Sequence, residues 1–206
     1  MKVKICGLRT EEAVLAAEDA GADFLGFIFY EKSHRHVLPE EVRGLTKHVQ
    51  RAKTVGVFVD APLDEVNAAA DFCSLDFVQL HGHESAAYAR SVCRPVIKAF
   101  RWGDDFSAEK ANEYPAEIIL LDSFSKDAVG GTGQRFRWRE AAEETARLEK
   151  PLLVAGGIAS GNVREAEEVF RPYGVDVSGS LEIEKRKSVE RIREFMAVVQ
   201  KRRIPE

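Results

Sequence analysis

The sequence has 206 residues, with 34 acidic and 30 basic side chains, a formal net charge of −4 and a hydrophobic fraction of 45%. This composition is ordinary for a globular protein, and the slight negative charge provides no basic field, so we expect no nucleic-acid partner. No stretch approaches the roughly 18 apolar residues that span a membrane, and charges at Lys2, Lys4 and Arg9 interrupt any signal-peptide core. We therefore expect a cytoplasmic protein without membrane contact.

Short runs of β-branched and aromatic residues recur along the chain, and each is followed by a longer segment with helical periodicity. The runs are continuous rather than alternating, which is typical of strands buried on both faces, as in a parallel sheet. The predicted strands are Lys2–Cys6, Asp23–Phe29, Thr54–Val59, Phe77–Leu80, Val96–Phe100, Ile118–Leu121, Leu152–Ala155 and Val175–Val177.

The segments between these strands contain signals that start helices. Thr10 is an N-cap candidate before two glutamates, and Pro39 occupies a favourable first helical position. Apolar residues three or four positions apart indicate helices in the later segments as well. Those predicted helices cover residues 63–73, 84–92, 105–113, 138–148, 163–170 and 189–199.

The order of these elements indicates a fold. Eight strand–helix units in one undivided chain predict a single (β/α)₈ TIM barrel over residues 1–206, near that fold's lower limit of about 200 residues. An open doubly wound sheet is the alternative, but the chain lacks a dinucleotide-binding fingerprint. In a barrel the chemistry lies where the strands end, so the strand ends supply the candidate functional residues.

The chain contains three cysteines, Cys6, Cys73 and Cys93, and no C-x-x-C pair. We therefore expect neither a disulfide framework nor a metal site. Cys73 and Cys93 lie on or at the end of predicted helices, and we expect both to be buried structural thiols. Cys6 ends the first strand, where a thiolate acts as a base or nucleophile. Its alternative role is that of a small buried residue that closes the strand.

Two other strand ends carry groups that transfer protons. Asp122 follows a run of aliphatic residues, where a dry environment favours a protonated carboxyl, although helix capping or ion pairing would also explain it. His81 follows the fourth strand and suits an acid, a base, a positioning donor or a structural role. The loop from Ser123 to Trp138 contains the glycine-rich segment 130–133 and suits either a mobile lid or a flexible connection.

Anion-binding groups occur after the second strand. The loop over residues 31–36 contains Lys32, His34, Arg35 and His36. The planar guanidinium of Arg35 is the group best suited to a carboxylate, although such a loop can also be a solvated surface.

Glycines and serines follow strands seven and eight. Gly156 and Gly157 come after the seventh strand, and Ser178, Gly179 and Ser180 come after the eighth. Backbone N–H groups at these two neighbouring positions form the phosphate site that recurs in TIM barrels. The residues thus predict a barrel enzyme that binds a small phosphorylated and carboxylated substrate.

Motifs at all eight predicted strands resemble one known family in chain order. The matching segments are Val3–Leu8, Gly26–Phe29 with Lys32, Ser33 and Arg35, Val55–Val59, Val78–Gly82, Leu121–Ser123, Gly130–Gly133 with Phe136 and Trp138, Ala155–Ile158 and Val175–Ser178. The family they resemble is phosphoribosylanthranilate isomerase of tryptophan biosynthesis. The Lys-Ile-Cys-Gly and Gln-Leu-His-Gly motifs together are its most specific part.

The resemblance implies an Amadori rearrangement of the N-(5-phosphoribosyl)anthranilate substrate to the 1-deoxyribulose 5-phosphate product, which is redox-neutral and uses no cofactor. It implies that Asp122 is the general acid that protonates the ribose ring oxygen. Cys6, as a thiolate, would be the general base that removes the C2 proton. Arg35 would hold the anthranilate carboxylate, and the two glycine segments would hold the phosphate.

Two positions depart from the family pattern. Gly179 and Ser180 stand where the family has Ser-Gly, which changes the residue that can adopt a positive φ. Arg137 replaces an aspartate that is expected to cap the next helix.

Two other functions fit part of the pattern. One is the analogous isomerase of histidine biosynthesis, which carries an aspartate where Cys6 stands. The other is a non-catalytic barrel that binds a phosphorylated ligand. For the assembly we expect a monomer, or a homodimer formed through exposed apolar residues such as Phe29 and Tyr30.

Overall fold

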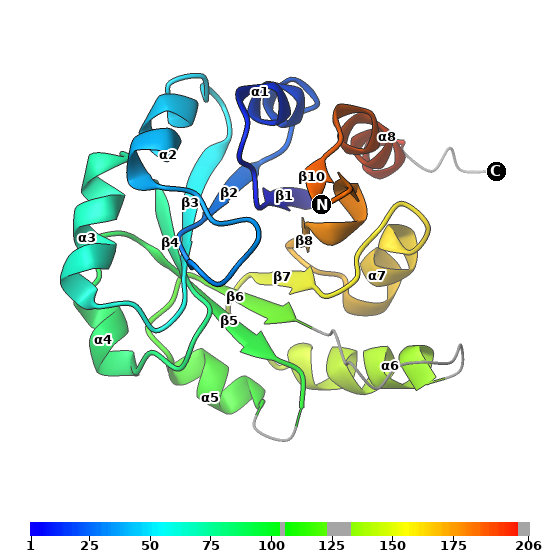
Figure 1. The fold of residues 1–206 in the computed structure, drawn as a ribbon. Helices are drawn as coiled ribbons and strands as arrows, with labels where there is room; N and C mark the ends of the chain where they lie inside the picture. Colours follow the sequence, from blue (N-terminus) through cyan, green and yellow to red (C-terminus); the bar gives the residue numbers. More distant parts are fainter. Residues whose placement is uncertain (104–105, 123–132, 202–206) are drawn as a thin grey trace.

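The fold is a closed parallel barrel surrounded by helices (Figure 1). The structure, a computed structural model, describes residues 1–103, 106–122 and 133–201, except for the side chains of residues 133–137. The barrel strands, which pair in chain order with β8 closing on β1, are β1 (Lys2–Cys6), β2 (Phe24–Ile28), β3 (Lys53–Phe58), β4 (Phe77–Leu80), β5 (Val96–Arg101), β6 (Ile118–Asp122), β7 (Leu152–Ala155) and β8 (Gly174–Val177).

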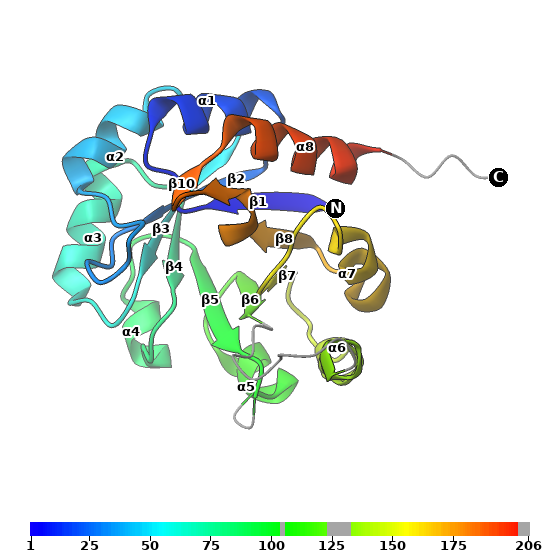
Figure 2. The same cartoon turned by 45° about the vertical axis from the view of Figure 1, so that its right-hand side comes forward.

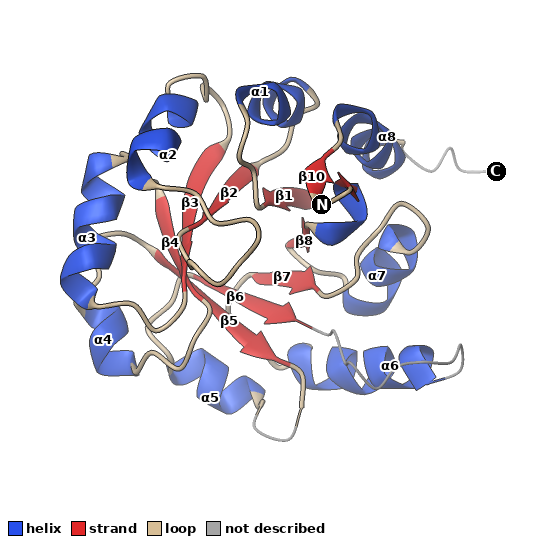
Figure 3. Ribbon diagram, in the orientation of Figure 1, coloured by secondary structure: helices blue, strands red, loops and turns tan. Residues whose placement is uncertain are grey.

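Helices lie outside the ring of strands (Figure 3). They are α1 (Glu11–Asp19), α2 (Pro39–Thr46), α3 (Leu63–Phe72), α4 (Ala86–Arg90), α5 (Ala108–Glu113), α6 (Gly133–Thr145), α7 (Val163–Phe170) and α8 (Val189–Gln200). Figure 2 shows α8 lying alongside α1, so the first and the last helix of the chain pack against each other. The predicted (β/α)₈ barrel is confirmed, and the open doubly wound sheet is wrong.

Local signals place several of the helix starts. Thr10 has extended backbone geometry, and its side chain accepts a hydrogen bond from the backbone N–H of Ala13 at 3.3 Å, as expected of an N-cap. Pro39 begins α2, where its missing N–H has no helical partner to lose. Ser188 caps α8 through the N–H of Arg191. None of the described helices is both long and apolar enough to cross a bilayer.

Two local predictions are corrected, and a third cannot be compared with the structure. Cys73 is buried as expected, but Cys93 is exposed because α4 already ends at Arg90 and the chain then turns along the surface. α6 begins at Gly133, so Arg137 lies inside the helix and is not at its capping position. The rest of the predicted lid, residues 123–132, lies outside the described residues.

The residues expected to mediate dimerisation are also less accessible than predicted. Phe29 and Tyr30 are both half-buried. The ring of Phe29 stacks on that of Phe58 with centroids 4.8 Å apart, so it packs within the chain. Both residues are thus partly covered within the chain, and their role in a dimer stays a prediction.

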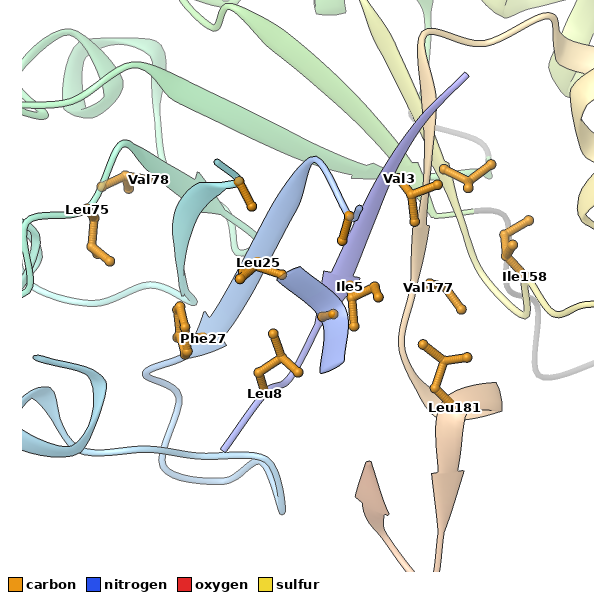
Figure 4. Packing of buried hydrophobic residues seen from close by; sticks show 14 of the residues in the cluster. Val3, Ile5, Leu8, Leu25, Phe27, Leu75, Val78, Ile158, Val177 and Leu181 are labelled. Atoms are coloured by element: carbon orange, nitrogen blue, oxygen red, sulfur yellow. The ribbon is translucent and has the colours of Figure 1, made fainter. Parts of the chain in front are cut away.

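Two layers of apolar side chains hold the barrel together. One cluster contains only strand residues, such as Val55, Ile97 and Leu120, and fills part of the barrel interior. The other lies between the strands and the helices. Figure 4 shows part of this second layer, with Ile5 and the neighbouring side chains of β1, β2 and β8. Burial of each such aliphatic side chain contributes about 1.5–3 kcal/mol.

A short hairpin follows β8 and was not predicted. The turn after β8 forms the 3₁₀ helix η1 (Gly179–Leu181). The chain then forms the antiparallel strands β9 (Glu182–Ile183) and β10 (Arg186–Lys187) before α8. The two residues of the hairpin turn, Glu184 and Lys185, both have positive φ. This hairpin places Lys187 next to the carboxyl ends of β8 and β1.

Candidate active site

The Cys6 side chain lies at the carboxyl end of β1 and is 5% exposed. Its neighbour Gly26 on β2 could not carry a side chain, because a Cβ there would lie 2.9 Å from Cys6 Sγ and 3.2 Å from Lys4 Nζ. The thiol and the ammonium group therefore converge on the space above Gly26. This glycine keeps that space open.

A buried ion pair lies directly below the thiol. Lys4 Nζ is 2.9 Å from Asp176 Oδ1, and the two side chains are 0% and 9% exposed. Burial by itself would lower the pKa of Lys4, but Asp176 and the thiolate of Cys6 raise it, and the net shift is upward. Lys4 is therefore a permanent cation in contact with Cys6.

The Cys6 thiol is subject to opposing influences. Burial raises its pKa, and Asp176 acts in the same direction. Lys4 and Lys187 lower the pKa and offset part of the shift, but the net pKa is still raised. A thiolate formed here is thus a stronger base than an exposed one, and it depends on the two ammonium groups.

Asp122 and His81 lie on another part of the barrel mouth. Asp122 ends β6 and is half-buried. Burial lowers the pKa of His81, and although Asp122 and Asp176 act in the opposite direction, the imidazole is held neutral near pH 7. These mutual effects place Asp122, His81 and the Lys4–Asp176 pair around one region at the carboxyl ends of the strands.

Gln79 determines the tautomer of His81. In this amide orientation its Nε2 lies 2.9 Å from His81 Nδ1 and donates to it, which assigns the ring proton to Nε2. Gln79 is fully buried, and its Oε1 has no hydrogen-bond partner within the described part of the chain. The histidine therefore has a single defined donor available for a bound molecule.

The loop between β2 and α2 is tied to the hairpin by three side chains, which we call the Glu182 clamp: Arg35, Glu182 and Lys187. Arg35 donates through Nε to Glu182 Oε1 at 2.6 Å and through one Nη to Oε2 at 2.9 Å. Lys187 Nζ donates to Glu182 Oε1 at 2.6 Å. Burial would raise the pKa of Glu182, but the bonds from Arg35 and Lys187 lower it to about 2.

Gly7 allows Arg35 to cross the end of β1. Gly7 has φ +81°, and a Cβ on it would lie 2.5 Å from Cδ of Arg35. Only glycine satisfies both the backbone conformation and this close approach. The guanidinium is thereby held over the strand end that carries Cys6.

The candidate phosphate-binding residues occupy two adjacent turns. Gly156 and Gly157 both have positive φ, which shapes the turn after β7. Ser178 Oγ donates to the carbonyl of Cys6 at 2.8 Å, and Ser180 Oγ donates to the carbonyl of Ile158 at 2.6 Å. Both hydroxyls therefore tie strand ends together, and the backbone N–H groups are the donors left for an anion.

The altered glycine order in this turn causes no backbone strain. Among the described residues, positive φ values do not include Gly179 or Ser180. A Cβ on Gly179 would make only an ordinary contact, 3.5 Å from Nη2 of Arg35. Exchange of serine and glycine at these two positions is thus compatible with the turn.

The structure brings the predicted residues Cys6, Arg35, Ser178 and Gly179 together on one side of the mouth, with Asp122 and His81 on another. Sequence reasoning missed five residues that support them: Lys4, Gln79, Asp176, Glu182 and Lys187. A signal existed for Lys4, because it lies two residues before Cys6 and shares its strand face. No group of three or more His, Cys, Asp or Glu side chains suited to a metal ion occurs in the described ranges.

Comparison with known proteins gives one consistent result. The family described as N-(5'phosphoribosyl)anthranilate (PRA) isomerase matches residues 3–198. The chain is 46% identical over 198 residues to the N-(5'-phosphoribosyl)anthranilate isomerase of Geobacter sulfurreducens, covering 95% of this chain and 97% of the relative.

Solved structures agree with the family match. One is a phosphoribosyl anthranilate isomerase in complex with reduced 1-(o-carboxyphenylamino)-1-deoxyribulose 5-phosphate, which is 33% identical, with a TM-score of 0.83 and coverage of 95% and 96%. Another shows monomers generated from the dimeric enzyme of Thermotoga maritima, with 32% identity, a TM-score of 0.84 and coverage of 96% and 97%.

Proposed function

The chain belongs to the phosphoribosylanthranilate isomerase family, and on this premise we propose that Cys6 and Asp122 are the base and acid of its reaction. The protein is an isomerase of tryptophan biosynthesis that acts on N-(5'-phosphoribosyl)anthranilate. The observation that carries the proposal is that a cation-flanked thiol and a half-buried carboxyl lie at the same mouth of one barrel, at the carboxyl ends of β1 and β6.

The reaction requires two proton transfers within one molecule. Asp122 donates a proton to the ribose ring oxygen, so that the ring opens to a Schiff base. The Cys6 thiolate then removes the proton from C2 of the sugar, which gives the enolamine and, after tautomerisation, the ketose. The raised pKa of Cys6 suits this task, since a more basic thiolate abstracts a carbon-bound proton more readily.

The two anionic ends of the substrate have separate candidate sites. We assign the anthranilate carboxylate to Arg35, whose Nε and one Nη contact Glu182, which leaves its other Nη for the substrate within the described part of the chain. We assign the phosphate to backbone N–H groups around Gly156, Gly157, Gly179 and Ser180, with Ser178 bracing the strand ends. One solved relative is in complex with a reduced deoxyribulose 5-phosphate, which supports a phosphorylated substrate.

The remaining positions complete the proposal. His81 is a positioning donor through Nε2.

The whole chain, residues 1–206, acts as one catalytic domain, because β1 and β8 from opposite ends of the chain pair with each other and both carry site residues. Since one solved relative is described as dimeric, a homodimer and a monomer are both retained as predictions, which sedimentation analysis distinguishes.

The test is turnover of the Cys6→Ala and Asp122→Asn variants. Each should lower kcat by about 10²–10⁴, the usual contribution of a proton-transfer group. The assay follows loss of substrate fluorescence, with the substrate generated in situ. Cys93→Ala, which replaces an exposed thiol, is the matched control and should retain full activity. Near-wild-type turnover in either site variant contradicts its assignment.

A further inference from the structure

Lys187 is a buried cation that the reaction as described does not use. Its side chain is 3% exposed, although it belongs to a short surface hairpin. Nζ donates to Glu182 Oε1 at 2.6 Å and to Ser178 Oγ at 3.3 Å. Ser178 in turn donates to the carbonyl oxygen of Cys6 at 2.8 Å. One hydroxyl thus links this ammonium group to the backbone of the thiol residue.

The charges around Cys6 do not cancel. Lys4 and Asp176 form a neutral pair below the thiol. In the Glu182 clamp, however, a single carboxylate faces two permanent cations, Arg35 and Lys187, and His34 Nε2 lies 3.4 Å from its Oε2. Even with a neutral imidazole the clamp therefore carries one net positive charge. A thiolate at Cys6 would balance this charge.

We propose that Lys187 is a positioning residue for the reaction: its ammonium group, held by Glu182 and Ser178 beside the end of β1, favours the thiolate form of Cys6. The inference rests on the proposed role of Cys6 as the base. The inference also gives a function to the β9–β10 hairpin between β8 and α8, because this hairpin places the Lys187 ammonium group beside the end of β1. Glu182 fixes the position of the ammonium group, and Ser178 fixes the strand end that it faces.

The pKa shifts agree with this arrangement. Burial is the largest influence on both groups: it raises the pKa of Cys6 and lowers that of Lys187. Against burial, Lys187 lowers the pKa of Cys6, and the thiolate of Cys6 raises the pKa of Lys187. The other charged groups that bear on Cys6 are Lys4 from β1 and Asp176 from β8.

Groups further from the thiol bear on it indirectly. Arg35 from the β2–α2 loop acts through Glu182, and His81 and Asp122 lie at the ends of β4 and β6. Among all these groups, Lys187 supplies a charge that can be removed without breaking the Lys4–Asp176 pair. It is therefore the best position at which to test the proposal.

The experiment measures thiolate formation at Cys6 directly in the free enzyme. Purified wild type and the Lys187→Met variant are treated with iodoacetamide across a pH series, and the rate of modification is read from the mass of the peptide that contains Cys6. Peptide-level reading separates Cys6 from the exposed Cys93. The pH midpoint of Cys6 modification should rise by about one unit in K187M, which corresponds to about tenfold less thiolate below the midpoint.

Three further variants separate charge from shape. Lys187→Arg retains the charge and should keep the midpoint within about half a unit of wild type. Lys185→Met removes the same charge from an exposed position in the same hairpin and should leave both the midpoint and the activity unchanged. Lys187→Gln removes the charge but keeps a donor for Glu182, which Arg35 still pairs, so the result does not depend on whether the apolar side chain of K187M is tolerated beside that carboxylate.

Steady-state kinetics provide the second readout. In K187M, kcat should fall about tenfold at neutral pH and recover as the pH rises, while KM changes little, and K187R should restore kcat. A merely structural role for Lys187 would lower activity at every pH. An unchanged midpoint for Cys6 modification in both K187M and K187Q overturns the inference.

The outcome is distinguishable from failure of the proposed function. If C6A retains turnover, the assignment of the base is wrong, whatever the midpoint of modification shows. If C6A loses turnover while the midpoint is the same in K187M and wild type, only the role of Lys187 is wrong.

Discussion

The two sides of the barrel mouth differ in the charges that surround their candidate catalytic groups. Around Cys6, on β1 and β8, charged side chains come from several elements and are fixed by short ion pairs. Around His81, which follows β4, the ring accepts a hydrogen bond from the neutral amide of Gln79, and the buried charges nearby, Lys98 and Glu84, form a neutral pair 2.8 Å apart. A thiol needs nearby cations to ionise, whereas a carboxyl that acts as an acid must keep its proton. The difference therefore matches the proposed division between base and acid.

The largest effect that tests this comparison is loss of the buried ion pair. Lys4→Met leaves the Asp176 carboxylate buried without its partner, which should lower the free energy of unfolding by about 3–5 kcal/mol. Lys2→Met is the matched control on the same strand: it also breaks a Lys–Asp pair, but the Lys2 side chain is 49% exposed, so the loss should stay below about 1 kcal/mol. Urea denaturation measures both variants. Equal losses would show that the Cys6 side is not stabilised by its buried charge.

A smaller effect concerns the stability of the fold at low pH. The folded chain holds the pKa of Glu182 at about 2, below its ordinary value of 4.5. The clamp therefore stabilises the fold fully above pH 4.5, and this contribution is lost as the pH falls from 4.5 towards 2. The loss should amount to at most about 3–3.5 kcal/mol, because the shift of about 2.5 units is worth 1.36 kcal/mol per unit.

The measurement for this prediction is the urea midpoint between pH 2.5 and pH 6. Because other carboxylates also titrate there, the informative quantity is the difference between wild type and Glu182→Gln, which should shrink as the pH falls. Glu184→Gln in the same hairpin is exposed and should follow wild type at every pH. A constant difference between wild type and E182Q would contradict the depressed pKa.

The fold was predictable, and so was the position of the proposed catalytic pair at the barrel mouth, because both depend on local patterns. Buried parallel strands are continuous apolar runs, and a reactive side chain directly after such a run must lie at the barrel mouth. Cys6 and Asp122 satisfy this rule, and the barrel itself is confirmed.

The supporting charges were not predictable in the same way. Lys187 stands in a run of charged residues, with Glu184, Lys185 and Arg186 before it, and such a run normally indicates a solvated surface. Only the hairpin turn makes Lys185 exposed and the Lys187 side chain buried. The prediction that Cys93 is buried was wrong for the converse reason. α4 ends at Arg90, so a thiol that the sequence placed at the end of a helix lies at the surface.

The smallest effect lies on the other side of the mouth. Gln79→Met removes one hydrogen bond to His81, but it also removes Oε1, for which the described chain provides no partner. The lost bond and the relieved desolvation penalty nearly cancel, so the free energy of unfolding should change by no more than about 1 kcal/mol. This is well below the change expected for K4M, although Lys4 and Gln79 are both fully buried.

The Gln79→Met variant also tests how the Gln79 amide affects the tautomer and the pKa of His81. Without the donor at Nδ1, His81 is free to carry its proton on either nitrogen, so its pKa should rise and kcat should fall by less than about tenfold. Proton NMR titration follows the pKa, with His83, which is exposed, as the internal reference. A loss of stability as large as that of K4M would mean that the β4 side of the mouth depends on its buried polar group as strongly as the β1 side does. The proposed division between a thiolate base on one side and a carboxyl acid on the other would then need another physical cause.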